Sequence, residues 1–418
     1  MKSIALSSML FLAAYSPATA QIIQKPVGCF AGTNGTNPDV LAHPETRGVL
    51  LSYKWNEIET SPGVFDFTDL NTDINTITTA GLPYSLAILG GSFGSPDWLI
   101  DGLGASYFDF NYQNQDWRLP LWWEQMVMDR LDTLITAVAD QYANDPMLSH
   151  VYVTQMTVNG VEGHLNGVDM NAFASSGFTP QNWITSAEAT TLMYAEAFPT
   201  KPIVFEVHEI DQDTVVPSAI MYSMDQHPEL CERFGVAMWW LSGKTSYQSD
   251  MLECLANFDG DKYAQVIGRS DQPQRFRDSL YSTVFTQAKE LGIRYMEPWP
   301  FEFQYHTSDS LIEDFNEWAD EHFSTADTCG LMSSISETSE AVSNLSIYPN
   351  PTTNLLNVTG IGMTEITILD MVGKEVVSQV FSSTDSKRLN IEFLPPGQYV
   401  IRTHNKDGSE ARGVFVKK

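Results

Sequence analysis

Residues 47–99 read RGVLLSYKWNEIETSPGVFDFTDLNTDINTITTAGLPYSLAILGGSFGSPDWL. Two short apolar runs, at residues 49–53 and 84–89, flank a segment with apolar residues at Leu70, Ile74 and Ile77. That spacing places the three apolar residues on one face of a helix, whereas the short runs are typical of buried strands. The stretch therefore predicts a βαβ unit with parallel strands.

The same alternation of strand and helix continues along the chain to residue 323. Eight apolar runs predict strands over residues 27–31, 49–53, 84–89, 150–158, 203–208, 236–241, 264–268 and 293–297. Seven amphipathic segments predict helices over residues 70–79, 121–142, 183–197, 216–225, 246–256, 276–291 and 311–322. Eight strands joined by helices over about 300 residues predict an α/β fold, a (β/α)8 TIM barrel.

The periodicity stops after the last predicted helix. Residues 324–344 are rich in Ser and Thr, which predicts a linker. From residue 345 to residue 418, short alternating runs are separated by turn signals such as Pro395-Pro396-Gly397. This pattern predicts a second, small all-β domain, an immunoglobulin-like sandwich.

The first 20 residues have the features of a secretory signal peptide. Lys2 precedes an apolar run at residues 4–14, and the small residues Ala18-Thr19-Ala20 suit a cleavage site. The barrel is then expected to occupy residues 21–323. Because a spanning helix needs roughly 20 apolar residues, neither this run nor any other stretch predicts a membrane span.

Export favours disulfides among the four cysteines, because secreted proteins meet an oxidising environment. Cys231 and Cys254 lie on either side of the sixth predicted strand, and Cys29 and Cys329 lie at the two ends of the barrel segment. We predict these two pairs. The cysteine spacing fits no zinc motif, and no cofactor is expected.

The charge of the chain restricts its partners. There are 52 acidic and 23 basic residues, a net charge of -29. Such a charge repels nucleic acid and anionic membrane surfaces. A neutral glycan remains a possible partner, because it is bound by aromatic side chains and hydroxyl partners. The chain has 10 Trp, 16 Tyr and 22 Phe that could supply the aromatic side chains.

Two stretches resemble known families. The segment after the first quoted strand contains Trp55, Ile58, Glu59, Pro62, Gly63, Phe65, Asp66 and Phe67, followed by Pro96, Trp98 and Leu99. In these residues it resembles the barrel β-galactosidases and, more widely, the retaining (β/α)8 glycoside hydrolases of clan A. This resemblance implies a carbohydrate substrate.

The C-terminal domain contains the short motifs Tyr348-Pro349-Asn350-Pro351, Leu356-Asn357-Val358, Ile368-Leu369-Asp370, Gly373-Lys374-Glu375-Val376, Gly397-Gln398-Tyr399-Val400 and Phe415-Val416-Lys417-Lys418. In these motifs it resembles the sorting domain of the bacterial type IX secretion system. The resemblance implies that the type IX secretion machinery is a partner and that the protein is secreted, or attached to the cell surface, by way of the periplasm.

Hydrolysis of a glycosidic bond needs two carboxyl groups, and barrel enzymes place them at the C-terminal ends of the strands. Glu162 lies just beyond the fourth run, and Glu297 ends the eighth. We predict that Glu162 is the acid and Glu297 the nucleophile, with Glu206 in reserve. The clan pattern differs, since its acid directly follows an Asn, whereas Gly160 follows Asn159 here, and its nucleophile ends the seventh strand.

Alternation predicts which side chains face the barrel interior. In the fifth run, Glu206 and His208 share one face, and burial of an unpaired carboxylate beneath the helices would be costly, so both should point inward. In the fourth run, the face that becomes polar toward its end is predicted to be interior. Its residues are Val151, Val153, Gln155, Thr157 and Asn159.

The remaining candidates are expected to bind the substrate. Aromatic residues near strand ends are candidate platforms for sugar rings, namely Trp55, Trp98, Trp240 and Trp299. The polar candidates are Asn159, His164, His208 and Arg269. Glu206 with His208 is too small a set to predict a metal site. The alternative function is a non-catalytic glycan-binding or cell-surface protein on the same scaffold.

Overall fold

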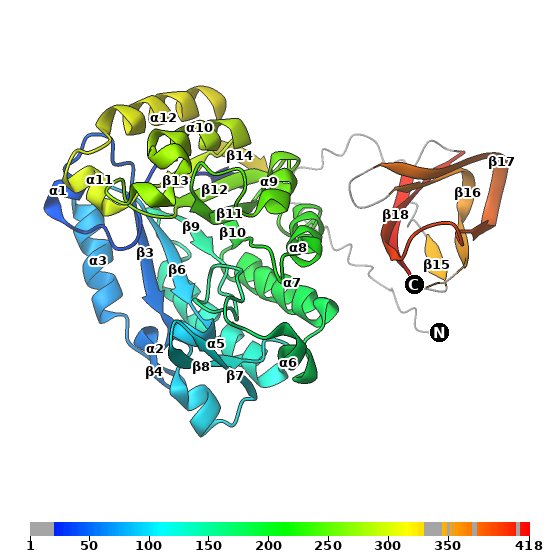
Figure 1. Cartoon of the computed structure of the whole chain (residues 1–418), viewed down its shortest axis with the longest axis horizontal. Coiled ribbons are helices and arrows are strands. Elements are labelled where there is room, and N and C mark those ends of the chain that lie inside the picture. Colours follow the sequence, from blue (N-terminus) through cyan, green and yellow to red (C-terminus); the bar gives the residue numbers. More distant parts are fainter. Residues whose placement is uncertain (1–20, 330–344, 349–351, 353, 370–373, 407–409) are drawn as a thin grey trace, which may run out of the picture. The chain divides into compact units, whose positions relative to one another are not determined.

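The computed structural model describes residues 21–329, 345–348, 352, 354–369, 374–406 and 410–418 (Figure 1). The chain forms two compact units, Met1–Leu331 and Met332–Lys418. The predicted signal peptide and most of the predicted linker lie outside the described residues. Within the described residues, no helix is both long and apolar enough to cross a membrane.

The first unit is built on one curled sheet of eight parallel strands (Figure 1). A parallel bridge between Ala31 and Val49 joins its two edges, so the sheet closes. The predicted TIM barrel is thereby confirmed. In sheet order the strands are β2 (Gly28–Cys29), β13 (Tyr295–Glu297), β12 (Asp261–Val266), β11 (Phe234–Leu241), β10 (Ile203–Glu206), β9 (Leu148–Tyr152), β6 (Tyr84–Leu89) and β3 (Val49–Lys54).

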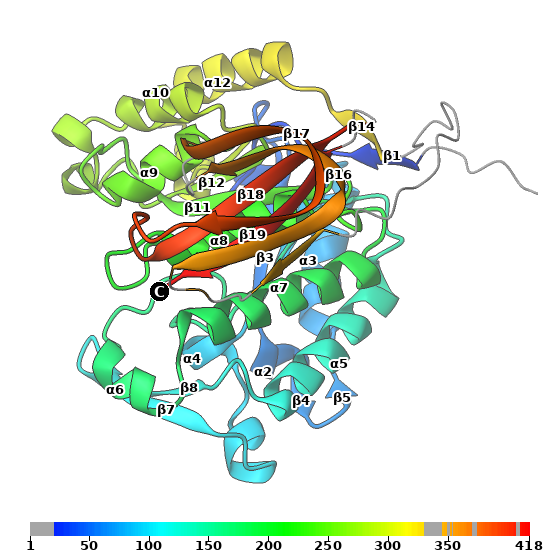
Figure 2. The same ribbon diagram turned by 90° about the vertical axis from the view of Figure 1, so that its right-hand side faces the viewer.

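Helices surround the barrel and bury their apolar faces against it (Figure 2). Leu70, Ile74 and Ile77 are the buried residues of the first long helix, as their spacing predicts. The long helices are α3 (Thr68–Thr79), α5 (Gln125–Tyr142), α7 (Pro180–Ala197), α8 (Val215–Asp225), α9 (Ser249–Ala256), α10 (Ser282–Leu291) and α12 (Asp309–His322). Short helices are α1 (Pro38–Leu41), α2 (Trp55–Ile58), α4 (Gly91–Gly94), α6 (Met170–Ser175) and α11 (Pro300–Gln304).

Three predicted helices start too early. Helices α5 and α9 begin at Gln125 and Ser249, not at residues 121 and 246, and the largest difference is in the helix predicted at residues 276–291. The structure has two 3₁₀ turns there, η2 (Pro273–Arg275) and η3 (Arg277–Ser279), before α10 begins at Ser282. Asp278 and Ser279 have positive φ angles, which a continuous helix cannot accommodate. The apolar spacing alone could not show this break.

The barrel interior also differs from the prediction. Tyr152 of β9 belongs to a buried interior cluster with Val204 and Ala237, whereas Val151 packs in the outer layer between strands and helices. The predicted interior face of the fourth run is therefore wrong. Strand β9 ends at Tyr152, and residues 153–165 form a loop instead of the expected continuation of the strand.

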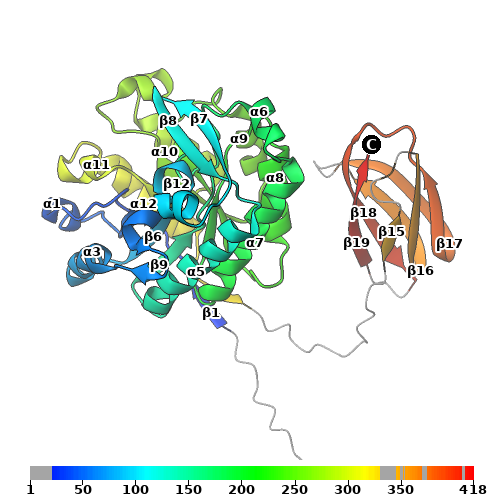
Figure 3. The ribbon, with the colours of Figure 1, turned by 90° about the horizontal axis from the view of Figure 1, so that it is seen from below.

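Three small antiparallel ribbons accompany the barrel and were not predicted. A hairpin of β7 (Tyr107–Tyr112) and β8 (Gln115–Pro120) packs on α4 and, through Phe108 and Phe173, on α6 (Figure 3). The other two ribbons pair β4 (Glu59–Ser61) with β5 (Val64–Phe65) and β1 (Gln21–Gln24) with β14 (Ala326–Cys329).

The second unit is all-β, as predicted. Its five antiparallel strands enclose a separate apolar core that includes Leu356, Ile368 and Phe415. The strands are β15 (Ser346–Tyr348), β16 (Leu355–Leu369), β17 (Glu375–Asn390), β18 (Gly397–Asn405) and β19 (Glu410–Lys417).

The predicted disulfide pairs are wrong. Cys29 and Cys254 are free thiols, whereas Cys231 is disulfide-bonded. Cys29 is fully buried in β2, where its backbone N–H donates to Asn316. Cys254 lies on helix α9. Sequence position relative to a strand gave no information on these side-chain directions.

Candidate active site

Four neighbouring strands end in large polar or aromatic side chains directed into the barrel. Glu206 ends β10 two residues after the interior residue Val204, and Trp239 follows Ala237 in β11 in the same way. Gln265 of β12 lies in register with Glu297 of β13. Period-two alternation thus sets one polar layer near the C-terminal mouth of the barrel, where barrel enzymes carry their sites.

Glu297 is completely buried and accepts three hydrogen bonds. Its Oε1 accepts from the hydroxyls of Tyr152, at 2.9 Å, and Tyr295, at 2.7 Å, and its Oε2 accepts from Gln265 Nε2 at 2.9 Å. Burial raises the pKa of Glu297 to about 7, while the three donors oppose that rise. The carboxyl group is firmly positioned, but it has no contact with solvent.

The loop of residues 153–165 explains that burial, because it fills the centre of the barrel mouth. Val161 is fully buried and belongs to the same interior cluster as Tyr152 and Tyr295. The loop approaches Gly90 so closely at Gly160 that a Cβ on Gly160 would lie 2.2 Å from the Gly90 nitrogen. Gly160 also has a φ angle of +90°, so glycine is required there on both counts.

Glu162 follows this inserted segment and reaches solvent. The side chain of Asn159 accepts hydrogen bonds from the backbone N–H groups of Val161, at 3.0 Å, and Glu162, at 2.7 Å, which fixes the turn. About 25% of the Glu162 side chain is exposed. Burial raises its pKa to about 7; His208 opposes the rise and Glu206 adds to it.

Glu206 and His208 form a buried pair next to Glu162, both facing inward as alternation predicts. The two carboxylate oxygens of Glu206 lie 2.9 and 3.0 Å from His208 Nδ1. The backbone N–H groups of Gly163, at 2.5 Å, and Trp239, at 3.0 Å, donate to the same carboxylate. Burial raises the pKa of Glu206, and the two backbone donors oppose this.

Two neutral histidines complete the cluster. Burial lowers the pKa of His208 to about 4 and that of His164 to about 3. The two rings lie 5.5 Å apart, and His164 Nε2 is 3.5 Å from Glu162 Oε2. At neutral pH both imidazoles are uncharged, so they can exchange hydrogen bonds with hydroxyl groups without adding positive charge.

A cavity of about 340 Å³ opens beside this cluster. Tyr247, which is 40% exposed, and Gln248 line it together with His164 and His208. The sequence analysis missed Tyr247 and Gln248, because it placed both inside a helix starting at residue 246, whereas α9 begins at Ser249 and both residues lie in the preceding loop. The cavity is also lined by Leu165, Asn166, Gly167, Val168, Met170, Glu209, Asp211 and Gln212, so no lysine or arginine is among its lining residues.

The structure therefore brings together Glu162, His164, Glu206 and His208, whereas Glu297 lies in a second group. Trp239 connects the two groups. Its backbone N–H donates a hydrogen bond to Glu206, and its ring lies 5.2 Å from that of Tyr152, whose hydroxyl donates to Glu297. The catalytic roles of these residues stay predictions.

None of the four tryptophans predicted to stack on sugars lines the cavity, and each indole N–H is already bonded within the protein. The acceptors are Glu59 Oε2 for Trp55, the Glu59 carbonyl for Trp98, the Val207 carbonyl for Trp240 and the Val266 carbonyl for Trp299. Trp240 does contact the site, since its ring lies 5.7 Å from that of His208. Arg269 is exposed and pairs with Asp271 at 2.9 Å.

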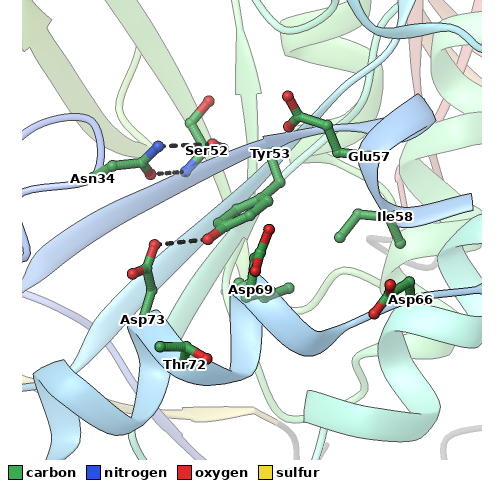
Figure 4. A pocket seen from close by; sticks show the side chains of 10 residues that line it. Asn34, Ser52, Tyr53, Glu57, Ile58, Asp66, Asp69, Thr72 and Asp73 are labelled. Atoms are coloured by element: carbon green, nitrogen blue, oxygen red, sulfur yellow. Dashed lines mark hydrogen bonds between the residues drawn. The ribbon is translucent and has the colours of Figure 1, made fainter.

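A larger cavity, of about 490 Å³, lies between the end of β3 and helix α3 and shares no residue with the Glu162 cluster (Figure 4). Figure 4 shows Tyr53 pointing to Asp73, which accepts its hydroxyl hydrogen bond at 2.6 Å. Four carboxylates line this cavity, and no histidine is among its lining residues. Hydrogen bonds from Thr68 lower the pKa of one of these carboxylates, Asp66. Acid–base chemistry is therefore better placed at Glu162.

Among the described residues, His43, His306 and Asp309 form a group whose ligand atoms lie within 4.8 Å of one another. His43 Nδ1 accepts the Glu45 backbone N–H at 3.2 Å, so in the neutral ring the proton sits on Nε2, 3.1 Å from Asp309 Oδ1. A metal ligand would need a lone pair at Nε2. The group is better described as hydrogen-bonded side chains around one carboxylate than as a metal site.

Comparison with known families confirms the nature of the second unit. Residues 346–417 match the secretion system C-terminal sorting domain. The domain indicates a secreted or cell-surface protein handled by type IX secretion. Pro349, Asn350 and Pro351 of the predicted motif lie outside the described residues. No curated protein sequence matches the chain.

Solved structures similar to the chain include several carbohydrate-cleaving enzymes, each with a TM-score below 0.5. The catalytic domain of β-amylase from Paenibacillus polymyxa is 9% identical, with a TM-score of 0.49 over 72% of this chain and 100% of that chain. Endo-glycoceramidase II from Rhodococcus sp. is 12% identical, with a TM-score of 0.47 over 88% of this chain and 98% of that chain. At such identities these likenesses assign no activity to the chain.

Proposed function

We propose that this protein is a secreted glycoside hydrolase that acts on a poly- or oligosaccharide, with Glu162 as its proton donor. The observation that supports this most strongly is a partly exposed carboxyl group whose pKa is raised to about 7, beside a cavity at the barrel mouth. A general acid works best when its pKa is near the working pH, because it must hold a proton and also release it.

The second carboxyl group of the proposal is Glu297, with Glu206 in reserve. In a retaining reaction, the glycosidic C–O bond breaks as Glu162 gives its proton to the leaving oxygen, and the ionised Glu297 forms a bond to the anomeric carbon. Water then releases the sugar, and Glu162 takes up a proton from that water. Three donors favour the ionised form of Glu297. For the sugar to reach it, Val161 and its loop must move.

A second candidate function is binding of a glycan without cleavage. It is favoured by the complete burial of both Glu206 and Glu297, whose oxygens are already occupied by protein donors. If the roles of these two carboxylates are purely structural, only Glu162 of the three candidates is left for catalysis. Hydrolysis of a glycosidic bond needs two carboxyl groups.

The two functions are separated by assaying the purified full-length chain against a panel of polysaccharides. Release of reducing ends by the wild type, and its loss in Glu162→Gln, would support the hydrolase. Glycan binding in affinity electrophoresis, without cleavage of any member of the panel, would favour the binding protein. No binding and no cleavage would contradict both.

We also expect the two units to be separable. Deleting residues 345–418 should leave the barrel folded but retained in the periplasm, because the sorting domain has its own apolar core and carries the export signal. Circular dichroism of the purified barrel and cell fractionation measure the two effects. A truncated chain that is insoluble, or that still reaches the medium normally, would contradict this expectation.

A further inference from the structure

Besides the 340 Å³ cavity beside Glu162, another cavity, of about 280 Å³, lies at the barrel mouth on the side of β3 and β6. It is lined by Asn56, just after β3, by Ser92 and Phe93 of α4, just after β6, and by Trp117 and Arg118 of β8. The C-terminal ends of two barrel strands thus supply one wall, and the β7–β8 hairpin supplies the other. This position is at the same end of the barrel as Glu162.

Two aromatic rings, one from each side, pack together in the lining of the cavity. Phe93 and Trp117 pack with ring centroids 4.4 Å apart and planes inclined by 31°. The Trp117 indole N–H donates to the Tyr112 carbonyl at 3.3 Å, across its own hairpin, which fixes the ring. Both residues are only partly buried. A fixed and partly exposed indole offers a flat apolar face for the C–H side of a sugar ring.

Polar and charged groups surround the two rings, since Asp97, Asp116 and Arg118 also line the cavity. The Arg118 guanidinium donates to Asp97 and Asp101, each at 2.6 Å, so its positive charge is compensated. The amide of Asn56 and the hydroxyl of Ser92 also line the cavity. Aromatic rings bordered by amide, hydroxyl and carboxylate groups, with the one arginine paired to carboxylates, suit an uncharged ligand that has many hydroxyls.

Two contacts connect the structural elements that line the two mouth cavities. The loop of residues 153–165 contacts the α4 side, where Ser92 N–H donates to the Thr157 carbonyl at 3.0 Å. The hairpin reaches the other side, where the ring of Tyr112 lies 6.3 Å from that of His164. His164 lines the 340 Å³ cavity beside Glu162, so a chain of several sugar units could extend from one cavity to the other.

We propose that the Trp117 cavity is a second sugar-binding subsite, which holds a neutral unit of the same glycan that reaches Glu162. The proposal rests on the proposed function for the identity of the ligand as a glycan. It makes the substrate an oligo- or polysaccharide of neutral sugars bound across the mouth, and it makes Trp117 a residue that determines the length of chain recognised.

The test is binding of neutral β-1,4-linked oligosaccharides of increasing length, built from glucose, mannose, xylose or N-acetylglucosamine, measured by calorimetry on the full-length protein. Trp117→Ala should weaken binding of the longer members roughly threefold to tenfold, while the shortest members that bind are unaffected. Trp117→Phe should recover most of the loss, because it keeps an aromatic face.

Trp318→Ala is the matched control. Trp318 is also partly buried and stacked, on His322 of the same helix α12, but it is not among the residues that line either mouth cavity. Equal weakening by both alanine variants, or equal weakening at every length, would indicate a general defect and overturn the proposal. Wild-type binding of glycans that is unchanged in Trp117→Ala would overturn the subsite alone, and no binding by the wild type would overturn the proposed function as well.

Discussion

Glu297→Gln should abolish turnover of every glycan that the wild type cleaves, a loss of at least about a thousandfold in kcat, because an amide cannot form or assist the bond to the anomeric carbon. Binding of the same glycan should be nearly unchanged, since the substitution keeps the size of the side chain. Steady-state kinetics on the substrate found in the polysaccharide panel, together with calorimetric binding, measure the two effects.

The Glu297→Gln substitution should also lower the stability of the fold, and this effect must be measured separately from the loss of turnover. Tyr152, Tyr295 and Gln265 all donate to Glu297, but a glutamine in its place has one acceptor oxygen and a donor amide. At least one buried donor then loses its acceptor, which should lower the free energy of unfolding by about 1–3 kcal/mol. Urea unfolding measures this loss.

Tyr295→Phe provides the control for that cost. It removes one hydrogen bond to Glu297 but leaves the carboxylate in place, so it should lower stability while retaining most of the turnover. Wild-type turnover in folded Glu297→Gln would show that the carboxylate is purely structural. A similar loss of turnover in both variants would show that the effect arises from the disturbed hydrogen bonds.

The sequence predicted the barrel well, because each strand and helix carries a local pattern. The fifth run shows why alternation succeeds there. Glu206 and His208 alternate with Val207 and Phe205, so burying the apolar pair beneath the helices leaves only one direction for the polar pair. Their inward direction could be predicted because burying an unpaired carboxylate beneath the helices would cost free energy.

The fourth run lacked that contrast, and the prediction of its interior face was wrong. Tyr152 and Val151 are both apolar enough for either face, so alternation could not decide between them. The inward course of the next loop depends on Gly160 fitting against Gly90, a contact between residues 70 positions apart that no local pattern reveals. Trp117 was missed for the same reason, since a hairpin brings it to the mouth. Tyr247 was missed because the helix predicted from residue 246 begins only at Ser249.

Glu162→Gln should have a different effect from Glu297→Gln. Without the acid, natural glycans should be cleaved roughly a hundredfold to ten-thousandfold more slowly, because their leaving group needs a proton. Aryl glycosides with a good leaving group should be cleaved nearly as fast as by the wild type. Glu206→Gln, next to the acid but fully buried, should show a smaller loss and no such dependence on the leaving group.

The pH dependence of kcat/KM tests the same roles of Glu162 and Glu297 independently. Glu162 must be protonated and Glu297 ionised, and the pKa of each is raised to about 7, so wild-type kcat/KM should peak near pH 7 and fall on both sides. The fall at high pH comes from the loss of the Glu162 proton. In Glu162→Gln, assayed with an aryl glycoside, that alkaline fall should disappear while the acidic one remains. An alkaline fall that persists unchanged in the variant would show that another group is the acid.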